Sequence, residues 1–283
     1  MLPVQKSESV SEGKCPAKGG NKLARPTVGL ALGAGAARGL SHIGVLKVFE
    51  EEGIPVDYIA GTSIGALIGA IYSAGQSIHD MEKIAMHLKK AYFIDFTLPK
   101  MGFIEGNRIR DFVRLFTYNK NIEELKIPLA IVATDIRTGE RIVFTEGNAA
   151  DAVRASVAIP GVIVPVKWKG RLLVDGAVSD RLPVSIVREM GADIVIAVDV
   201  TGLNTNAELN HIVDIIMQSM DMMQMEIVQN REDHSDIMIR PDVVHFGSFS
   251  FERGQELIQA GEQAARAQIE RIKHLLTNWK ESD

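Results

Sequence analysis

The segment Glu52–Gly75, EGIPVDYIAGTSIGALIGAIYSAG, is an extended apolar run that changes into a helical pattern at a single serine. Its centre, Gly61–Gly65, reads GTSIG, a G-x-S-x-G sequence. Such a sequence can form a strained turn between a strand and a helix, which exposes the serine as a nucleophile. An ordinary tight turn that contains serine could have the same five residues. The rest of the sequence is therefore needed to distinguish a nucleophile turn from an ordinary one.

The surrounding sequence predicts an α/β fold. Apolar runs at 27–32 and 56–60 have the length of buried strands, and each precedes a helical pattern, at 37–52 and 64–73. Strands that alternate with helices in this way pair in parallel. A mostly helical stretch is expected at 77–126 and an amphipathic helix at 258–279, with further strands at 128–134, 141–144, 171–174, 194–198 and 236–240.

Composition limits the classes of protein that need to be considered. The chain has 283 residues, of which 46% are hydrophobic, and its net charge of −5 predicts no nucleic-acid partner. The longest nearly apolar run, Ile64–Ala74, is far shorter than the roughly 18 residues of a membrane-spanning helix. Residues 1–25 are polar, lack the apolar core of a signal peptide and hold the only cysteine, Cys15. We therefore expect a flexible tail at 1–25 and a cytoplasmic protein.

One domain over 26–283 is the expected organisation, because no repeat or linker follows the tail. Within it we expect a motif-bearing core at about 28–200 and a helical part at 205–283.

A glycine cluster, LGAGAARG at Leu32–Gly39, connects the first strand to the first helix. Three interpretations compete. A dinucleotide-binding G-x-G-x-x-G would need glycine where Arg38 stands, and a P-loop would need a Gly-Lys-Ser/Thr that is absent. The third is a cradle of backbone N–H groups at a helix N-terminus, which can hold an oxyanion and would then belong with Ser63.

Asp175 is the candidate partner of the serine. It ends the apolar run of LLVDGA, just before a glycine, and ligand sites in parallel sheets gather at the carboxyl ends of strands, where Ser63 also lies. Asp-Gly is equally a common turn pair. None of the seven histidines lies in a loop suited to a catalytic triad, although His245 comes closest.

Three separated motifs together resemble the patatin-like phospholipases. They are LGAGAARGLSHIGVL, then GTSIG, then the run from ATDIRTGE through AVRASVAIPG and VPV to LLVDGA, and the resemblance covers roughly Pro26 to Val200. The bacterial branch similar to the catalytic domain of neuropathy target esterase matches best. The resemblance implies a three-layer α/β/α sandwich with a mainly parallel sheet and a Ser–Asp dyad, with Ser63 as nucleophile and Asp175 as general base.

The same resemblance assigns the remaining site residues. Gly61 and Gly65 frame the nucleophile, Gly176 and Ala177 complete the base motif, and the oxyanion hole falls on the loop of Gly33, Gly35, Ala36, Ala37, Arg38 and Gly39. The family loop usually reads GGGxRG or KG, so alanine replaces glycine here. If Ala36 adopts a positive φ, it is strained. Arg38 either steadies the loop or attracts a lipid phosphate.

The function that the resemblance implies is hydrolysis of carboxylic esters of phospholipids or lysophospholipids through an acyl-serine. It needs no cofactor and no metal, takes a lipid or ester substrate, and fits transient contact with a membrane surface at the inner face. A weakly active or non-catalytic regulatory protein of the same fold is one alternative. An acyltransferase is the other, although it would carry histidine where Thr62 precedes the serine.

The acyl chain of such a substrate needs an apolar channel. Two groups of side chains are candidates for its wall, although ordinary core packing would also explain them: Tyr92, Phe93, Phe96, Leu98, Met101 and Phe103, and the methionines Met217, Met220, Met222, Met223 and Met225.

Overall fold

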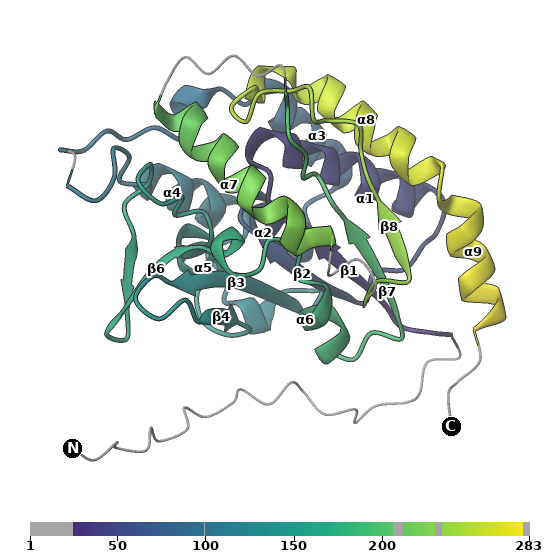
Figure 1. The fold of residues 1–283 in the computed structure, drawn as a ribbon. Helices are drawn as coiled ribbons and strands as arrows, with labels where there is room; N and C mark the ends of the chain where they lie inside the picture. Colours follow the sequence, from purple (N-terminus) through teal and green to yellow (C-terminus); the bar gives the residue numbers. More distant parts are fainter. Residues whose placement is uncertain (1–24, 99, 206–211, 230–233, 280–283) are drawn as a thin grey trace.

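The strands expected from the sequence, together with one that was not expected, assemble into one eight-stranded sheet (Figure 1). The computed structural model describes residues 25–98, 100–205, 212–229 and 234–279, so the tail expected at 1–25 lies almost entirely outside the described residues. The strand order is β5-β6-β3-β2-β1-β7-β8, and β4 pairs with β3 outside this path. Five strands are mutually parallel: β1 (Val28–Leu32), β2 (Tyr58–Thr62), β3 (Leu129–Asp135), β7 (Ile194–Val198) and β8 (Ile237–Ile239).

Three strands at one side of the sheet run antiparallel to their neighbours: β4 (Arg141–Phe144), β5 (Val166–Trp168) and β6 (Arg171–Asp175). The predicted class, a mainly parallel α/β sheet, is confirmed. The sequence did not predict β5, because its three residues are too few to show a strand pattern.

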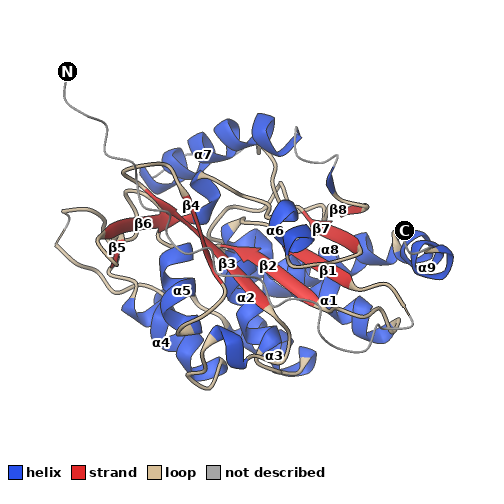
Figure 2. Ribbon diagram, turned by 90° about the horizontal axis from the view of Figure 1, so that it is seen from below, coloured by secondary structure: helices blue, strands red, loops and turns tan. Residues whose placement is uncertain are grey.

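Helices cover both faces of the sheet (Figure 2). They are α1 (Ser41–Glu51), α2 (Ile64–Ser73), α3 (Ile78–His87), α4 (Asn107–Phe116), α5 (Ala149–Ser156), α6 (Val184–Glu189), α7 (Ile212–Gln229), α8 (Gly254–Arg266) and α9 (Ile269–Asn278). The single helix expected at 258–279 is two helices, because the chain bends at Ala267–Gln268. No glycine or proline marks this break, so periodicity alone could not detect it.

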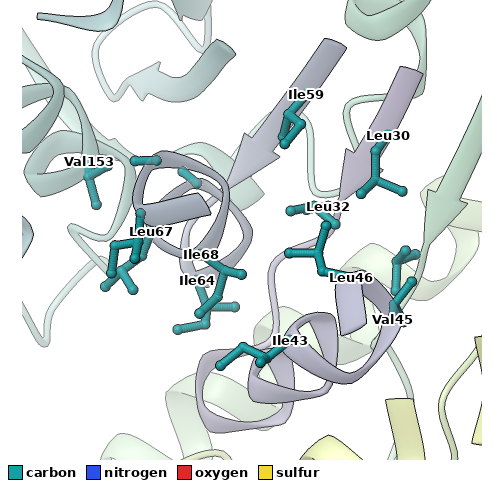
Figure 3. Packing of buried hydrophobic residues seen from close by; sticks show 14 of the residues in the cluster. Leu30, Leu32, Ile43, Val45, Leu46, Ile59, Ile64, Leu67, Ile68 and Val153 are labelled. Atoms are coloured by element: carbon teal, nitrogen blue, oxygen red, sulfur yellow. The ribbon is translucent and has the colours of Figure 1, made fainter. Parts of the chain in front are cut away.

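The two faces of the sheet carry side chains of different size. Leu30 and Leu32 of β1 and Ile59 of β2 pack against α1 and α2 on one face (Figure 3). On the opposite face the alternate residues are small, such as Ala31 and Ala60, and α6 packs there. Since alternate residues of a strand point to opposite faces, this pattern places a thick core under α1 and α2 and lets α6 approach closely.

Within the described residues, none of the helices has both the length and the apolar content needed to cross a bilayer.

Candidate active site

Ser63 occupies the strained turn between β2 and α2. Its φ of 56° and ψ of −121° lie in a region that residues other than glycine rarely adopt. A Cβ at Gly61 would lie 2.6 Å from the backbone of Ala66, and one at Gly65 would lie 2.2 Å from the carbonyl oxygen of Leu32. Both glycines are therefore required for this close approach, and the turn is a nucleophile elbow in its geometry.

Asp175 contacts the serine directly. The Ser63 hydroxyl donates to Asp175 Oδ2 over 2.7 Å, and Asp175 Oδ1 accepts the N–H of Ala177 over 2.8 Å. An imidazole cannot fit between two groups at hydrogen-bond distance, so this direct contact agrees with the Ser–Asp pair that the resemblance implies. His245, the closest histidine candidate, has a largely exposed side chain 3.7 Å from Asp242.

Strand register brings the two residues together by a route that the sequence reasoning had wrong. Thr62 of β2 pairs with Val132 of β3, and the next residue of β3, Ala133, pairs with Asp175 of β6. However, β6 runs antiparallel to β3, so Asp175 does not lie at the carboxyl end of a parallel strand. It meets Ser63 because β6 ends level with the point where β2 ends.

Burial raises the pKa of Asp175 to about 6. The side chain is 2% exposed, and removal of its charged form from water is the largest effect. The hydrogen bonds from Ser63 and Ala177 and the positive charge of Arg181 act in the opposite direction and lower the pKa. The carboxylate is thus mostly ionised at pH 7, with a basicity suited to accepting a proton.

The glycine-rich loop presents two backbone donors to the site. The N–H of Ala37 donates to the carbonyl of Ser248 over 2.9 Å, and that of Arg38 donates to Gly35 over 3.1 Å. Within the described residues, the N–H groups of Gly35 and Ala36 have no backbone acceptor. These two N–H groups are the candidate oxyanion donors, whereas those of Ala37 and Arg38, which the sequence also suggested, already have acceptors.

Ala36 begins a 3-10 helix, η1 (Ala36–Leu40), with a φ of 48°. Gly35 before it is extended, with a φ of 178°. Of the two backbone states left open for Ala36, the structure has the one with positive φ, in a region that costs an alanine about 1 kcal/mol. At the end of the loop, a Cβ at Gly39 would lie 2.2 Å from Ile64 Cγ2, so the loop packs directly on the residue after the nucleophile.

The start of the loop is anchored on three sides. The N–H of Gly33 donates to Val198, and that of Ala34 donates to Arg181, over 3.1 and 3.0 Å. His42 Nε2 lies 2.9 Å from the carbonyl oxygen of Gly33 and must donate to it. Burial lowers the pKa of His42 to about 4, so the ring is neutral at pH 7.

Arg38 is a structural residue of the loop. Its side chain is 2% exposed, Nη2 donates to Asp221, and Nη1 donates to the carbonyl of Gly202 over 3.0 Å. Of the two roles considered from the sequence, steadying the loop agrees with this geometry. Attraction of a lipid phosphate does not, because a buried and paired guanidinium is inaccessible to one.

An apolar cavity reaches the serine. It encloses about 1000 Å³ of space, part of it open to solvent, and includes Ser63 and Ala36 in its lining. Among the described residues of the lining, Ser63 is the only one with a polar side chain. The rest come mainly from α2, α3, α4 and the loops around them, for example Leu67, Ile71, Met81, Phe93 and Phe112. Such a cavity suits a hydrocarbon chain placed next to a reactive oxygen.

The cavity wall differs from the one expected. Phe93 lines it, but the other five side chains of the aromatic loop are between 38% and 82% exposed. Of the methionines expected in the wall whose side chains are described, none lines the cavity: Met217 is buried in the core and Met220 packs against it, as ordinary core packing would have it, whereas Met222 and Met223 face outward. The side chain of Met225 lies outside the described residues.

Two further polar residues hold the site, and the sequence reasoning assigned a role to neither. Ser156, at the end of α5, accepts the N–H of Ser63 on its hydroxyl over 2.8 Å. The hydroxyl of Thr134 donates to the carbonyl of Asp175 over 3.0 Å. Ser156 lies in AVRASVAIPG, a run that carried the resemblance, but a short polar residue in a helix gives no sign of which backbone group it will bind. In the described part of the chain, no three His, Cys, Asp or Glu side chains gather as metal ligands.

Comparison with known families gives a match over more than half of the chain. The model of the patatin-like phospholipase family matches residues 30–188, which include the glycine-rich loop, Ser63 and Asp175.

Curated relatives match the same part of the chain. An uncharacterized NTE family protein of Mycobacterium tuberculosis is 39% identical over 180 residues, which is 62% of this chain and 50% of that protein. The patatin-like phospholipase domain-containing protein 6 of Homo sapiens is 39% identical over 182 residues, 62% of this chain and 13% of that protein. The lysophospholipase NTE1 of Yarrowia lipolytica is 33% identical over 204 residues, 68% of this chain and 14% of that protein. The chain thus spans half the length of the mycobacterial relative and far less of the other two.

Two solved structures share the fold. VipD from Legionella pneumophila aligns with 87% of this chain at a TM-score of 0.50 and 16% identity, covering 67% of its own chain. The type III effector protein ExoU aligns with 88% of this chain at a TM-score of 0.51 and 12% identity, covering 53% of its own chain. At these identities the likeness concerns the fold alone.

Proposed function

Since the chain belongs to the patatin-like phospholipase family, we propose that it hydrolyses carboxylic esters of phospholipids or lysophospholipids, with Ser63 as nucleophile and Asp175 as general base. The observation that carries the proposal is the 2.7 Å hydrogen bond between Ser63 Oγ and Asp175 Oδ2, on the wall of an apolar cavity. The lysophospholipase name of the Yarrowia relative supports this substrate class.

The first half of the reaction forms an acyl-serine. Ser63 Oγ attacks the ester carbonyl carbon while its proton passes to Asp175 Oδ2. The carbonyl oxygen becomes an oxyanion and accepts the N–H groups of Gly35 and Ala36, which are fixed before the charge develops. The tetrahedral intermediate then collapses, the bond to the alcohol oxygen breaks, and that oxygen takes the proton from Asp175.

The second half releases the fatty acid. Water attacks the acyl carbon and gives a proton to Asp175, and a second oxyanion forms at the same donors. When the bond from the acyl carbon to Ser63 Oγ breaks, the proton returns from Asp175 to Oγ. Ser63 is the N-cap of α2. The positive end of this helix therefore favours negative charge on Ser63 Oγ.

A fluorophosphonate probe tests the proposal, because it reacts with an activated serine. Wild-type protein should be labelled and should hydrolyse a p-nitrophenyl ester, and Ser63→Ala should do neither while it keeps the melting temperature of a folded protein. Ser73→Ala is the matched control: Ser73 is buried at the end of α2, and its hydroxyl has no partner among the described residues. That variant should be labelled like the wild type.

Each other outcome identifies an alternative. A folded wild type that is not labelled would favour a non-catalytic regulatory protein of this fold. A labelled protein that passes the acyl group to a second alcohol faster than to water would be an acyltransferase.

The proposal includes transient contact with a lipid surface. α7 lies across the outside of the molecule (Figure 1), and its outer face carries Ile212, Ile215, Met222 and Met223, which are 54–64% exposed. On the inner side of α7, Ile216 lies near Gly161, which is part of the segment 159–163 that lines the cavity. The loop that supplies Phe93 to the cavity also exposes apolar side chains. Apolar surface beside an apolar cavity suits a substrate that is drawn from a lipid aggregate.

We also propose that 26–283 is one domain. The later part of the chain supports this, because β8 pairs with β7 and so adds a strand to the sheet that carries the site.

A further inference from the structure

A buried cluster of charges joins α7 to the loops of the site. Asp221 of α7 is 2% exposed, and its Oδ2 accepts a hydrogen bond from Nη2 of Arg38. Its Oδ1 lies 2.8 Å from Nη2 of Arg181, in an ion pair without a well-aligned hydrogen bond. Both arginine side chains are themselves only 2% exposed. The carboxylate of Asp221 is therefore the ion-pair partner of two buried guanidinium groups. Its removal would leave both positive charges without this partner.

The two arginines belong to different parts of the site. Arg38 lies in the oxyanion loop, two residues after Ala36. Arg181 follows the loop that begins at Asp175, and its carbonyl accepts the N–H of Ala34 over 3.0 Å, so the two loops also meet through the backbone.

The nucleophile strand joins at the same point. The hydroxyl of Thr62, the residue before Ser63, donates to the carbonyl of Asp180 over 2.8 Å. Gln224, one turn along α7 from Asp221, donates to the carbonyl of Val178 over 3.3 Å. The nucleophile, the base and the oxyanion donors are thus all tied to the segment at 178–181, and α7 holds that segment from outside.

We propose that Asp221 is a positioning residue, which holds the oxyanion loop through Arg38 and the base loop through Arg181 in the arrangement that ester hydrolysis requires. This inference rests on the proposed function. Asp221 lies outside the region 30–188 that the family model matches. Catalytic groups lose effectiveness when they move by a fraction of an ångström, which is why a rigid support matters here.

The cluster also acts on the base through its charges. The positive charge of Arg181 lowers the pKa of Asp175, and the negative charge of Asp221 weakens that effect. Other charged groups on the elements around Asp175 have partners of their own: Asp180 pairs with Arg141, Asp135 pairs with Arg171, and Arg154 of α5 donates to the carbonyls of Glu105 and Val164. Neutralising Asp221 should therefore lower the pKa of the base, and neutralising Arg181 should raise it.

The pH dependence of kcat with a soluble p-nitrophenyl ester tests the inference. We expect Asp221→Asn to lower kcat roughly 10- to 100-fold with a smaller change in KM, and to move the acid limb of the profile to lower pH. Arg181→Met should lower kcat and move the limb to higher pH. A role limited to stability would move neither limb. Asp193→Asn is the control. Asp193 precedes β7, and its Oδ2 accepts hydrogen bonds from the N–H and the hydroxyl of Thr27, so this variant should leave the limb in place.

A second variant covers the case in which the single changes do not fold. The triple change Arg38→Met, Asp221→Leu and Arg181→Met removes all three charges and keeps apolar volume in their place, a type of replacement that often preserves stability. We expect a folded protein with strongly reduced kcat. A folded triple variant with wild-type kcat would overturn the inference.

The remaining outcomes are distinct. Acid limbs that shift in the same direction in Asp221→Asn and Arg181→Met, or that do not shift at all, would also overturn the inference. If Ser63→Ala remains active, the proposed function itself fails, whatever the Asp221 variants do. If Ser63→Ala is inactive and Asp221→Asn is fully active, the positioning role alone fails.

Discussion

Two residues of the site, Ser63 and Ala36, have positive φ angles of 56° and 48° although neither is glycine. At Ser63 the strain is part of the elbow that exposes the hydroxyl. At Ala36 the strain falls on the residue whose N–H we propose as an oxyanion donor, and a glycine there could relax this backbone at lower cost.

We therefore predict that Ala36→Gly raises kcat. Relief of about 1 kcal/mol of misalignment at the oxyanion donors corresponds to about a fivefold gain. The gain should appear in kcat more than in KM, because the oxyanion exists only near the transition state. The melting temperature should stay the same or rise. A lower kcat together with a lower melting temperature would contradict the prediction and show that Ala36 is not strained in solution.

The burial of Asp175 should reduce the free energy of unfolding of the protein. Its folded pKa, about 6, lies above that of an unfolded aspartate. Between these two values the folded protein holds a proton that the unfolded chain has released, so stability falls as pH rises through this window. At pH values well above 6, burial of the ionised Asp175 carboxylate lowers the free energy of unfolding by its full amount, on the order of 3 kcal/mol.

The corresponding prediction concerns Asp175→Asn. This variant should lose ester hydrolysis to the same extent as Ser63→Ala, because the two residues act as a unit. At pH 8 it should be more stable than the wild type by up to about 3 kcal/mol, and the difference should shrink toward pH 4, where the wild-type carboxyl is protonated. Urea unfolding at both pH values measures this. A variant less stable than the wild type at pH 8 would show that the ionised carboxylate is well solvated or well paired.

Among the elements, α7 has an unusual distribution of side chains. Its charged Asp221 points inward and is buried, whereas Ile215, Met222 and Met223 point outward. A helix packed on a globular core normally shows the opposite arrangement. The inward charge is explained by its two arginine partners, and the outward apolar face by the lipid contact proposed above.

We predict that Ile215→Ser combined with Met222→Ser weakens binding to phosphatidylcholine vesicles about tenfold, as measured by co-sedimentation. Each change removes part of an apolar side chain whose burial is worth roughly 1.5–3 kcal/mol. Hydrolysis of a soluble p-nitrophenyl ester should be unchanged, and hydrolysis of vesicle lipid should fall. Ile136→Ser with Val143→Ser is the control, because these exposed side chains lie on β4 and the turn before it. Equal vesicle binding by both double variants and the wild type would exclude α7 as the contact.

At the scale of the whole molecule, the site is assembled where distant segments of the chain end at one level of the sheet. In the proposed mechanism, β2 carries the nucleophile, β6 carries the base, and the loop after β1 carries the oxyanion donors. The small residues on the face opposite α1 and α2 let the segment at 178–182 lie close to the sheet. The large core on the other face supports α2 and contains the cavity next to Ser63.

The sequence by itself determined the features that depend on neighbouring residues. Apolar runs between turns predicted the parallel strands, and GTSIG predicted the elbow because only glycine fits at Gly61 and Gly65. The alanine at position 36 indicated only that a positive φ there would be strained, because φ preferences belong to a single residue, and the value of φ came from the structure.

Tertiary structure alone decided which distant groups meet. The antiparallel direction of β6, the hydroxyl of Ser156 on the N–H of Ser63, and Asp221 between two arginines all depend on register and packing between segments that lie far apart in the chain. The outward direction of Met222 and Met223 was also decided there, because Val213, Ile216, Met217 and Met220 on the other face of α7 pack against the core. A side chain's partner is set by the position of the whole backbone, and no local pattern encodes that position.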